Sequence, residues 1–211
     1  MTKRKKFILI SLLVLLAIAA TVSIVISRKQ FRERKTEDLQ TAYSLFDSGK
    51  REEAIKLLEE RYQADKSDKQ VASRLASYYF QNKEYDNFTK IADEAKLEDA
   101  ATYTMRAFIA RGNGDYDSAL KDYEAAIKAN PKSPAVYIDL ANMYEVLNQP
   151  DKALETLKEG LNYSPKSSAL NLLAANAALQ LGDKAAAKEY AKKVLEIDKD
   201  NQRAKEILSR K

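Results

Sequence analysis

The side chains that could carry chemistry in this sequence are carboxylates, amines and phenols, because it contains no Cys, His or Trp. This composition excludes a Ser–His–Asp triad, a thiolate nucleophile, a disulfide, a lipid-bearing cysteine anchor and a His- or Cys-based zinc site. The paired carboxylates Glu52-Glu53 and Glu59-Glu60 are more typical of a solvated helix face than of acid–base catalysis. No glycine-rich phosphate loop follows a strand pattern. We therefore expect no enzyme activity, no metal and no cofactor.

The charge of the chain is unevenly distributed. The formal net charge is +5, but residues 1–34 carry eight basic residues and one acidic residue, and the rest is slightly acidic. A nucleic-acid-binding protein would spread its basic residues over a folded face. Here the basic residues flank an apolar run, which points to a membrane and away from nucleic acid.

That apolar run, residues 7–27, reads FILISLLVLLAIAATVSIVIS and contains no charge. A helix of this length spans roughly 30 Å, which is the thickness of the hydrocarbon core of a bilayer. The sequence therefore predicts a basic tail over residues 1–6, a single transmembrane helix over residues 7–27 and a basic juxtamembrane linker over residues 28–34.

Two other interpretations of this run remain open. A cleaved signal peptide could end at Ala17-Ile18-Ala19, although the apolar run continues well beyond that point, as far as Ser27. A buried core helix is disfavoured because no face of the run is polar. Orientation is nearly balanced, since four Lys or Arg residues precede the run and five follow it closely. We favour a single-pass membrane protein with a cytoplasmic N-terminal tail and the remaining chain on the extracytoplasmic side.

The rest of the sequence is helical and repetitive. Gly and Pro are scarce, with 5 and 4 residues, which argues against a β-sandwich or barrel. The sequence matches itself when it is shifted so that Pro131 aligns with Pro165, and between these prolines apolar residues recur at helical spacing. Pro150 suits the first turn of a helix, and Pro165 suits the position just after one. Each unit is thus predicted to be two antiparallel helices joined by a tight turn.

Small residues recur at equivalent positions, where they would let two helix axes approach closely. In the first helices they are Ala42, Ala76, Ala107, Ala141 and Ala175, and in the second helices Ala54, Ala119, Ala153 and Ala187.

At these residues the sequence resembles the tetratricopeptide repeat (TPR) family. The pattern Y-x2-LA-x2-Y…A-x3-L…P runs from Tyr137 through Ala141 and Ala153 to Pro165, and a GDY turn begins at Gly114. Phe88 departs from the usual Ala, and the second unit is short. The resemblance implies a right-handed α-solenoid over residues 35–201 with a capping helix over 202–211. Its five repeats would be 35–68, 69–99, 100–133, 134–167 and 168–201.

In this family the first helices line a concave groove that holds a partner's peptide. The positions that match the groove are Tyr43, Phe46, Ser77, Phe80, Phe108, Arg111, Ile138, Asn142, Glu145, Leu172, Asn176 and Leu179. The apolar members predict a partner with apolar side chains. In the family's clamp for acidic chaperone tails, Ile138 and Leu173 stand where Lys and Asn would be needed, which disfavours such tails.

The sequence thus favours a membrane-anchored scaffold that binds other proteins during assembly or quality control of envelope proteins. Two alternatives remain open. The chain could be a permanent structural subunit of a membrane complex, or a cytosol-facing docking protein similar to an import receptor.

Overall fold

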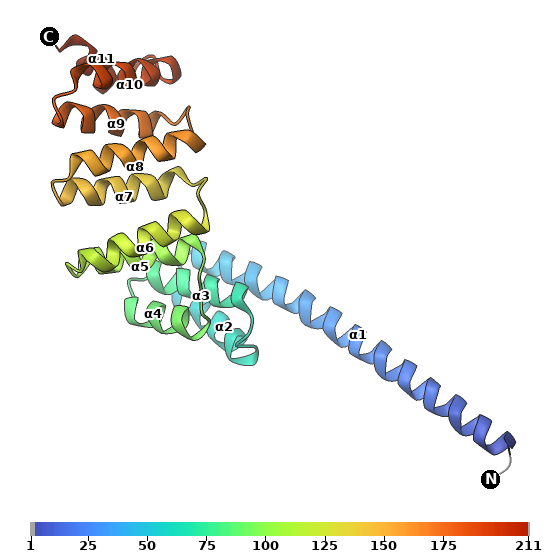
Figure 1. Ribbon diagram of the computed structural model, residues 1–211. Helices are drawn as coiled ribbons and strands as arrows, with labels where there is room; N and C mark the ends of the chain where they lie inside the picture. The colour runs from blue at the N-terminus through green and yellow to red at the C-terminus, as the bar shows by residue number, and fades with distance from the viewer. Residues whose placement is uncertain (1–2, 211) are drawn as a thin grey trace. The chain divides into compact units, whose positions relative to one another are not determined.

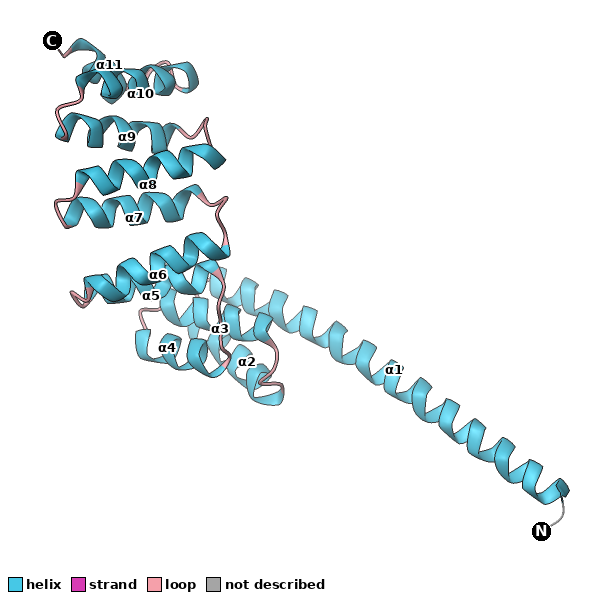
Figure 2. Cartoon of the chain, viewed as in Figure 1, coloured by secondary structure: helices cyan, strands magenta, loops and turns pink. Residues whose placement is uncertain are grey.

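The computed structural model describes residues 3–210, with side chains described for residues 35–210 and for residues 16, 18–23, 25–27 and 29. Within residues 3–210 the chain forms eleven α-helices and no strand, which confirms the all-α prediction (Figures 1 and 2). The helices are α1 (Lys3–Asp47), α2 (Arg51–Ala64), α3 (Lys69–Gln81), α4 (Tyr85–Glu94), α5 (Ala100–Gly112), α6 (Tyr116–Ala129), α7 (Pro134–Val146), α8 (Pro150–Tyr163), α9 (Ser168–Gln180), α10 (Lys184–Ile197) and α11 (Gln202–Ser209).

The helices gather into two compact units, residues 1–95 and residues 96–211, called unit 1 and unit 2 below. In unit 1, α1 packs on α2, α2 on α3 and α3 on α4. In unit 2, α5 to α11 also pack in chain order, and α9 additionally contacts α7 and α11. This contact between alternate helices is typical of stacked helical hairpins, so unit 2 has the architecture of an α-solenoid.

A left-handed residue closes the turn inside every helical hairpin. It is Gly49, Lys83, Gly114, Asn148 or Gly182, with φ between 56° and 87°. The residue that follows each of them donates a backbone hydrogen bond of 2.8–2.9 Å to a carbonyl five positions back, as in a Schellman motif. Glycine adopts this conformation without a steric penalty, and Asn tolerates it better than most residues. The alignment of Gly114 with Asn148 and Gly182 in the sequence therefore marks a real turn position.

The predicted small residues are all buried at the helix crossings. The five alanines of the first helices and the four of the second helices are each at most 2% exposed. Large side chains fill the spaces between them, and Tyr123, Tyr137 and Leu157 are fully buried. The small-residue pattern was therefore predicted correctly. Pro150 begins α8, and Pro165 lies just beyond its end, as expected.

One hydrogen bond from a side chain to a proline carbonyl occurs in two successive repeats, with a different donor residue in each. The Tyr137 hydroxyl donates to the Pro131 carbonyl at 3.1 Å, and the Asn171 side-chain amide donates to the Pro165 carbonyl at 3.2 Å. The same shift of the sequence aligns both donors and both acceptors, so the two bonds occupy the same place in successive repeats. Burial raises the pKa of the Tyr137 phenol to about 12, so that the hydroxyl keeps its proton and its donor role at neutral pH.

The predicted juxtamembrane linker comprises residues 28–34. They are helical and join the apolar segment to the first repeat helix as one 45-residue helix, α1 (Figure 1). The reason is local: residues 7–47 contain no Gly or Pro, and the basic segment is rich in good helix formers.

The predicted transmembrane segment lies in α1, but the side chains of residues 7–15, 17 and 24 lie outside the described residues. Among the residues that are described, no helix combines the length and the apolar character needed to cross a bilayer.

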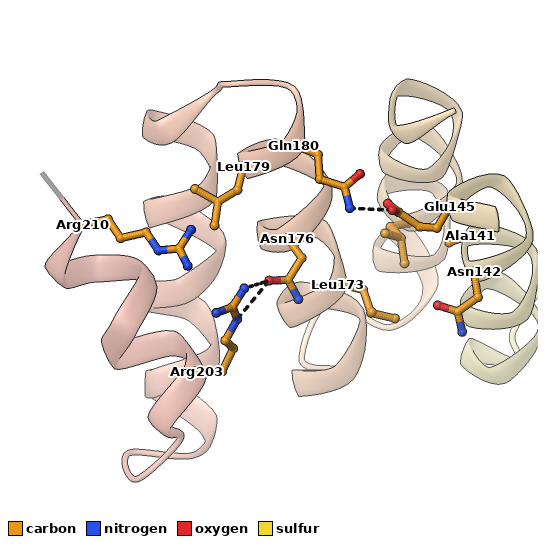
Figure 3. Close-up of a pocket in the computed structure, with 10 residues that line it drawn as sticks. Ala141, Asn142, Glu145, Leu173, Asn176, Leu179, Gln180, Arg203 and Arg210 are labelled. Carbon is orange, nitrogen blue, oxygen red and sulfur yellow. Dashed lines mark hydrogen bonds between the residues drawn. The ribbon is translucent and has the colours of Figure 1, made fainter. Parts of the chain in front are cut away.

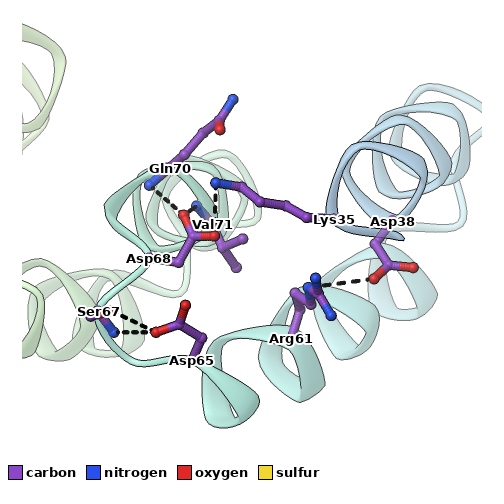
Figure 4. A network of polar contacts seen from close by, with 8 residues as sticks. All are labelled: Lys35, Asp38, Arg61, Asp65, Ser67, Asp68, Gln70 and Val71. Atoms are coloured by element: carbon purple, nitrogen blue, oxygen red, sulfur yellow. Dashed lines mark hydrogen bonds and ion pairs between the residues drawn. The ribbon is translucent and has the colours of Figure 1, made fainter. Parts of the chain in front are cut away.

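Two ion pairs hold the end of α1 against the rest of unit 1 (Figure 4). Lys35 Nζ lies 2.8 Å from Asp68 Oδ2, and Arg61 Nε lies 3.5 Å from Asp38 Oδ2. The Asp68 side chain also caps α3, because it accepts the backbone N–H groups of Gln70 and Val71. These side chains are at most 31% exposed, and the pairs connect the last part of α1 to α2 and to the start of α3.

Candidate functional site

The strongest candidate site is a groove of about 470 Å³ in unit 2, formed mainly by α7, α9 and α11, with one side chain from α8 (Figure 3). Its apolar surface comes from Ala141, Leu157, Leu173 and Leu179. Its polar surface is made of three carboxamides, one carboxylate and two guanidinium groups, which belong to Asn142, Asn176, Gln180, Glu145, Arg203 and Arg210. An apolar surface with a few converging polar groups is typical of a binding site.

Two hydrogen-bonded pairs position the polar side chains of the groove. Gln180 Nε2 donates to Glu145 Oε2 at 2.6 Å, which links α9 to α7. Arg203 donates from Nε and Nη2 to Asn176 Oδ1 at 3.2 and 3.1 Å, which links α11 to α9 (Figure 3). A third N–H of Arg203 bonds Glu206 at 3.1 Å. The groove wall is therefore set in place by contacts between successive helices.

The amides of Asn142 and Asn176 occupy equivalent places in successive repeats, on α7 and α9. Because Asn176 Oδ1 accepts from Arg203, its Nδ2 remains available as a donor. Within residues 3–210 the Asn142 amide has no hydrogen-bond partner, so it offers both a donor and an acceptor. Such a pair can bond the backbone of an extended chain, whose carbonyl and N–H groups repeat along its length.

The structure brings together four of the predicted groove residues, Asn142, Glu145, Asn176 and Leu179. Ile138 and Leu172 instead pack, half-buried, against the core of unit 2. Phe108 is 43% exposed, and the Arg111 guanidinium lies 5.5 Å from the centre of its ring. Burial raises the pKa of the neighbouring Asp139, and the positive charge of Arg111 offsets only part of this increase.

The other four predicted residues belong to unit 1. Tyr43 is well exposed, but the Phe46 ring stacks on Tyr78 with centroids 3.9 Å apart. Ser77 accepts a hydrogen bond from Gln81 at 3.2 Å. Phe80 packs against the rings of Tyr85 and Phe88 at 5.6 and 5.8 Å. Phe46 and Phe80 thus take part in packing within unit 1.

This difference in packing predicts different outcomes for Phe80 and Phe108, which the sequence assigned to the same groove. Phe80→Ala should lower the free energy of unfolding by about 1–3 kcal/mol, because it removes half-buried ring contacts. Phe108→Ala should change it by less than about 0.5–1 kcal/mol, because 43% of Phe108 is already exposed to solvent. Urea unfolding of both variants measures the difference, and equal losses would contradict this assignment.

Sequence reasoning missed Leu173, Gln180, Arg203 and Arg210 as groove residues. Leu173, Asn176 and Gln180 lie at helical spacing on one face of α9, so the pattern contained this signal. The arginines were missed because residues 202–211 were interpreted only as a cap. In the structure α11 contacts both α10 and α9, buries Ala204 and Ile207, and brings Arg203 to the groove, with Arg210 just after its end.

Comparison with known families agrees with this architecture. Residues 110–163 and 147–210 match the model of the tetratricopeptide repeat. The matched segments lie in unit 2 and include every residue of the groove.

The chain is also similar in sequence to curated proteins. The chain is 30% identical over 133 residues to the BBSome complex member BBS4 of Bos taurus, covering 60% of this chain and 25% of that protein. It is 36% identical over 75 residues to the photosystem I assembly protein Ycf3 of Prochlorococcus marinus (strain MIT 9211), covering 34% and 43%. The chain therefore spans less than half the length of these relatives.

Solved structures confirm the fold. The Pseudomonas aeruginosa pilF protein superposes with a TM-score of 0.67 at 15% identity, over 84% of this chain and 82% of that one. YrrB, described as a TPR protein with an unusual peptide-binding site, superposes with a TM-score of 0.61 at 15% identity, over 80% and 89%. At these identities the likeness establishes the helical-repeat fold alone.

Proposed function

We propose that this chain, which the family model and the structural likeness support as a tetratricopeptide repeat protein, is a membrane-anchored docking scaffold. Its groove between α7, α9 and α11 would bind a peptide segment of another protein. The observation that carries this proposal is the groove itself, where equivalent amides from successive repeats border an apolar surface. Leucine side chains would contribute most of the binding energy, and the amides would fix the direction of the bound chain.

The relatives are consistent with such a role. Ycf3 is a photosystem I assembly protein, BBS4 is a member of a complex, and YrrB has a peptide-binding site. By analogy, the chain would bind proteins during the assembly or quality control of membrane or envelope complexes. The anchor would raise the local concentration of the groove for partners in the same membrane.

Anchoring through residues 7–27 is supported by the sequence, where an uncharged apolar run lies between two basic clusters. The large apolar side chains described in this stretch are more than half exposed: Leu16, Ile18, Val22, Val25 and Ile26. Apolar side chains so exposed on one helix call for a covering environment, and a bilayer provides it. With the short N-terminal tail in the cytoplasm, the repeats would face the extracytoplasmic side.

Alkaline carbonate extraction tests the anchor. The full chain should remain with the membrane pellet, and a variant lacking residues 1–27 should move to the supernatant. Protease added to sealed vesicles then reports which side carries the repeats. Release of the full chain by carbonate would contradict the anchor and leave the groove proposal standing.

Paired substitutions in the groove test the docking role. Asn142→Ala with Asn176→Ala should reduce co-isolation of partners from solubilised membranes, because two side-chain donors to the bound backbone are lost. Asn130→Ala with Asn162→Ala changes the same residue type at exposed positions outside the groove and serves as a control. Unchanged recovery of partners by the groove variant would contradict the proposal.

A further inference from the structure

We infer that unit 2 carries a second binding site, which takes the guanidinium group of an arginine from a basic segment of a partner protein. The site is a furrow of about 400 Å³ between the second helices α6 and α8, and α7 also contributes to its lining. This furrow shares no residue with the groove between α7, α9 and α11. Arginine binding in the furrow would thus be independent of peptide binding in the groove.

The first observation concerns two carboxylates that line the furrow from different helices. Glu124 lies on α6 and Glu155 on α8, and within residues 3–210 neither carboxylate makes an ion pair or accepts a hydrogen bond. Burial raises the pKa of the Tyr144 phenol on α7, and the charges of both glutamates raise it further, so the three groups surround one space. The whole lining carries three glutamates and two lysines, a balance that attracts a cation.

The second observation is a buried hydroxyl without a partner. Thr156 lines the furrow from α8 and is only 8% exposed, yet within the described residues its hydroxyl makes no hydrogen bond. Thr89 and Thr104, which also lie in helices, each donate to the carbonyl four residues earlier, at 2.9 and 2.8 Å. A buried polar group without a partner costs free energy, and an N–H donor bound in the furrow would satisfy the Thr156 oxygen.

A cation already lies over the tyrosine of the furrow. The exposed Lys152 places its ammonium 5.6 Å from the centre of the Tyr144 ring. An ammonium is a strongly hydrated point charge, whereas a guanidinium is planar, less hydrated and able to stack on a ring while it bonds a carboxylate in its plane. A partner's arginine would therefore displace Lys152, stack on Tyr144 and donate to Glu124 or Glu155. Its methylene groups would lie on the half-buried Ile127.

The corresponding furrow in unit 1 shows which features are particular to unit 2. Its volume is similar, about 460 Å³, and one shift along the chain aligns the lining residues of the two furrows. In unit 1, however, the Tyr79 hydroxyl donates to Glu59, so that this carboxylate is already engaged. Lys90 and Ile91 stand where the second glutamate and the threonine stand in unit 2. Of the two furrows, the one in unit 2 therefore has the groups that a guanidinium needs.

Matched peptide arrays test this assignment. The full chain is labelled with a fluorophore, placed in lipid nanodiscs and applied to sets of random-sequence heptapeptides. The members of a set are identical except for a central arginine, lysine or citrulline, and citrulline keeps the shape of arginine without its charge. In the sets that bind, we expect arginine to exceed citrulline by about 10-fold or more, with lysine between them.

Glutamate variants locate the binding site. E124Q/E155Q should abolish the preference for arginine over citrulline, because it removes both charges and keeps the shape of the furrow. E189Q/E196Q is the matched control, because it makes the same change in charge at two exposed positions on α10 and should leave the preference intact. Circular dichroism should show the same helicity and melting for both variants.

Two further variants should change arginine binding in opposite directions. T156V removes the free hydroxyl and should weaken binding of the arginine peptides by about 3-fold to 10-fold. K152Q should strengthen it, because no resident ammonium then has to leave the Tyr144 ring. An increase in affinity cannot arise from loss of folding, so K152Q separates a binding role from a structural one.

Three results would overturn the assignment. Arginine and citrulline peptides could bind equally, which would exclude a charged ligand. Lysine peptides could bind as tightly as arginine peptides, which would exclude a guanidinium site. The E124Q/E155Q variant could keep the preference for arginine, which would place the binding outside the furrow. The groove variant N142A/N176A should retain the preference, and its loss there would likewise contradict a site between α6 and α8.

Discussion

Replacing Phe88 by alanine is expected to lower the free energy of unfolding by about 3–5 kcal/mol, as for other large buried aromatic residues. Phe88 is fully buried in α4, and its ring meets that of Phe80 edge to face at 5.8 Å. Chemical denaturation followed by circular dichroism measures the loss. The family pattern suggests the opposite, because alanine is the usual residue at this place and Ala54 and Ala119 occupy it in neighbouring repeats.

The physical reason lies in the length of the second repeat. The helix α4 has 10 residues, whereas α2, α6, α8 and α10 each have 14. A shorter helix brings fewer side chains to the core, so we expect the Phe88 ring to supply the missing volume. Phe88→Leu is the matched control, which keeps most of that volume and should cost less than about 1.5 kcal/mol. A Phe88→Ala variant as stable as the parent would show that the ring fills no such space.

Gly160→Ala is expected to destabilise the protein by about 1–2 kcal/mol, although alanine normally favours a helix over glycine. A Cβ atom at Gly160 would lie 2.8 Å from Tyr137 Cγ and 2.9 Å from Tyr137 Cβ. Tyr137 has little freedom to move, because its ring is buried and its hydroxyl bonds the Pro131 carbonyl. Either α8 or the tyrosine must therefore shift.

Gly112→Ala is the control for this change. Gly112 also lies in a helix, but apart from the adjoining residues of its own helix no atom lies within 4 Å of the Cβ that the substitution would add. It should cost nothing and gain up to about 1 kcal/mol. Thermal melts of the two variants should move in opposite directions. A stabilised Gly160→Ala variant would mean that α8 does not approach Tyr137 this closely.

The repeat architecture could be predicted from the sequence because its signals are local and periodic. Each signal reflects one structural requirement. The alanines allow close helix crossings, Pro150 begins α8, and Gly114 and Gly182 adopt the left-handed turn conformation. Residues 28–34, predicted as a linker, continue α1 because the segment contains no Gly or Pro that would stop a helix. The change from apolar to polar residues after Ser27 does not interrupt the backbone hydrogen bonds of this helix.

The groove was only partly predictable, because its members meet through packing between repeats. Asn142 and Asn176 followed from their equivalent positions in the motif. Arg203 and Arg210 lie outside the repeating pattern, and their role depends on α11 contacting α9. Phe80 matched a groove position in the motif, yet it packs on Tyr85 and Phe88, because a motif position does not determine which neighbour a large ring contacts.

Site-specific photocrosslinking in the native membrane tests the central claim most directly. A photoreactive amino acid is placed at Asn142 or Leu173 in the groove and, for comparison, at the exposed Lys158 and Lys192 on α8 and α10. The account predicts crosslinked partners from the two groove positions and few from the other two. Several partners would indicate a docking scaffold with exchanging clients, and one stoichiometric partner would indicate a permanent subunit. Crosslinks only from Lys158 and Lys192, or from all four positions equally, would contradict the claim that this groove binds the partner.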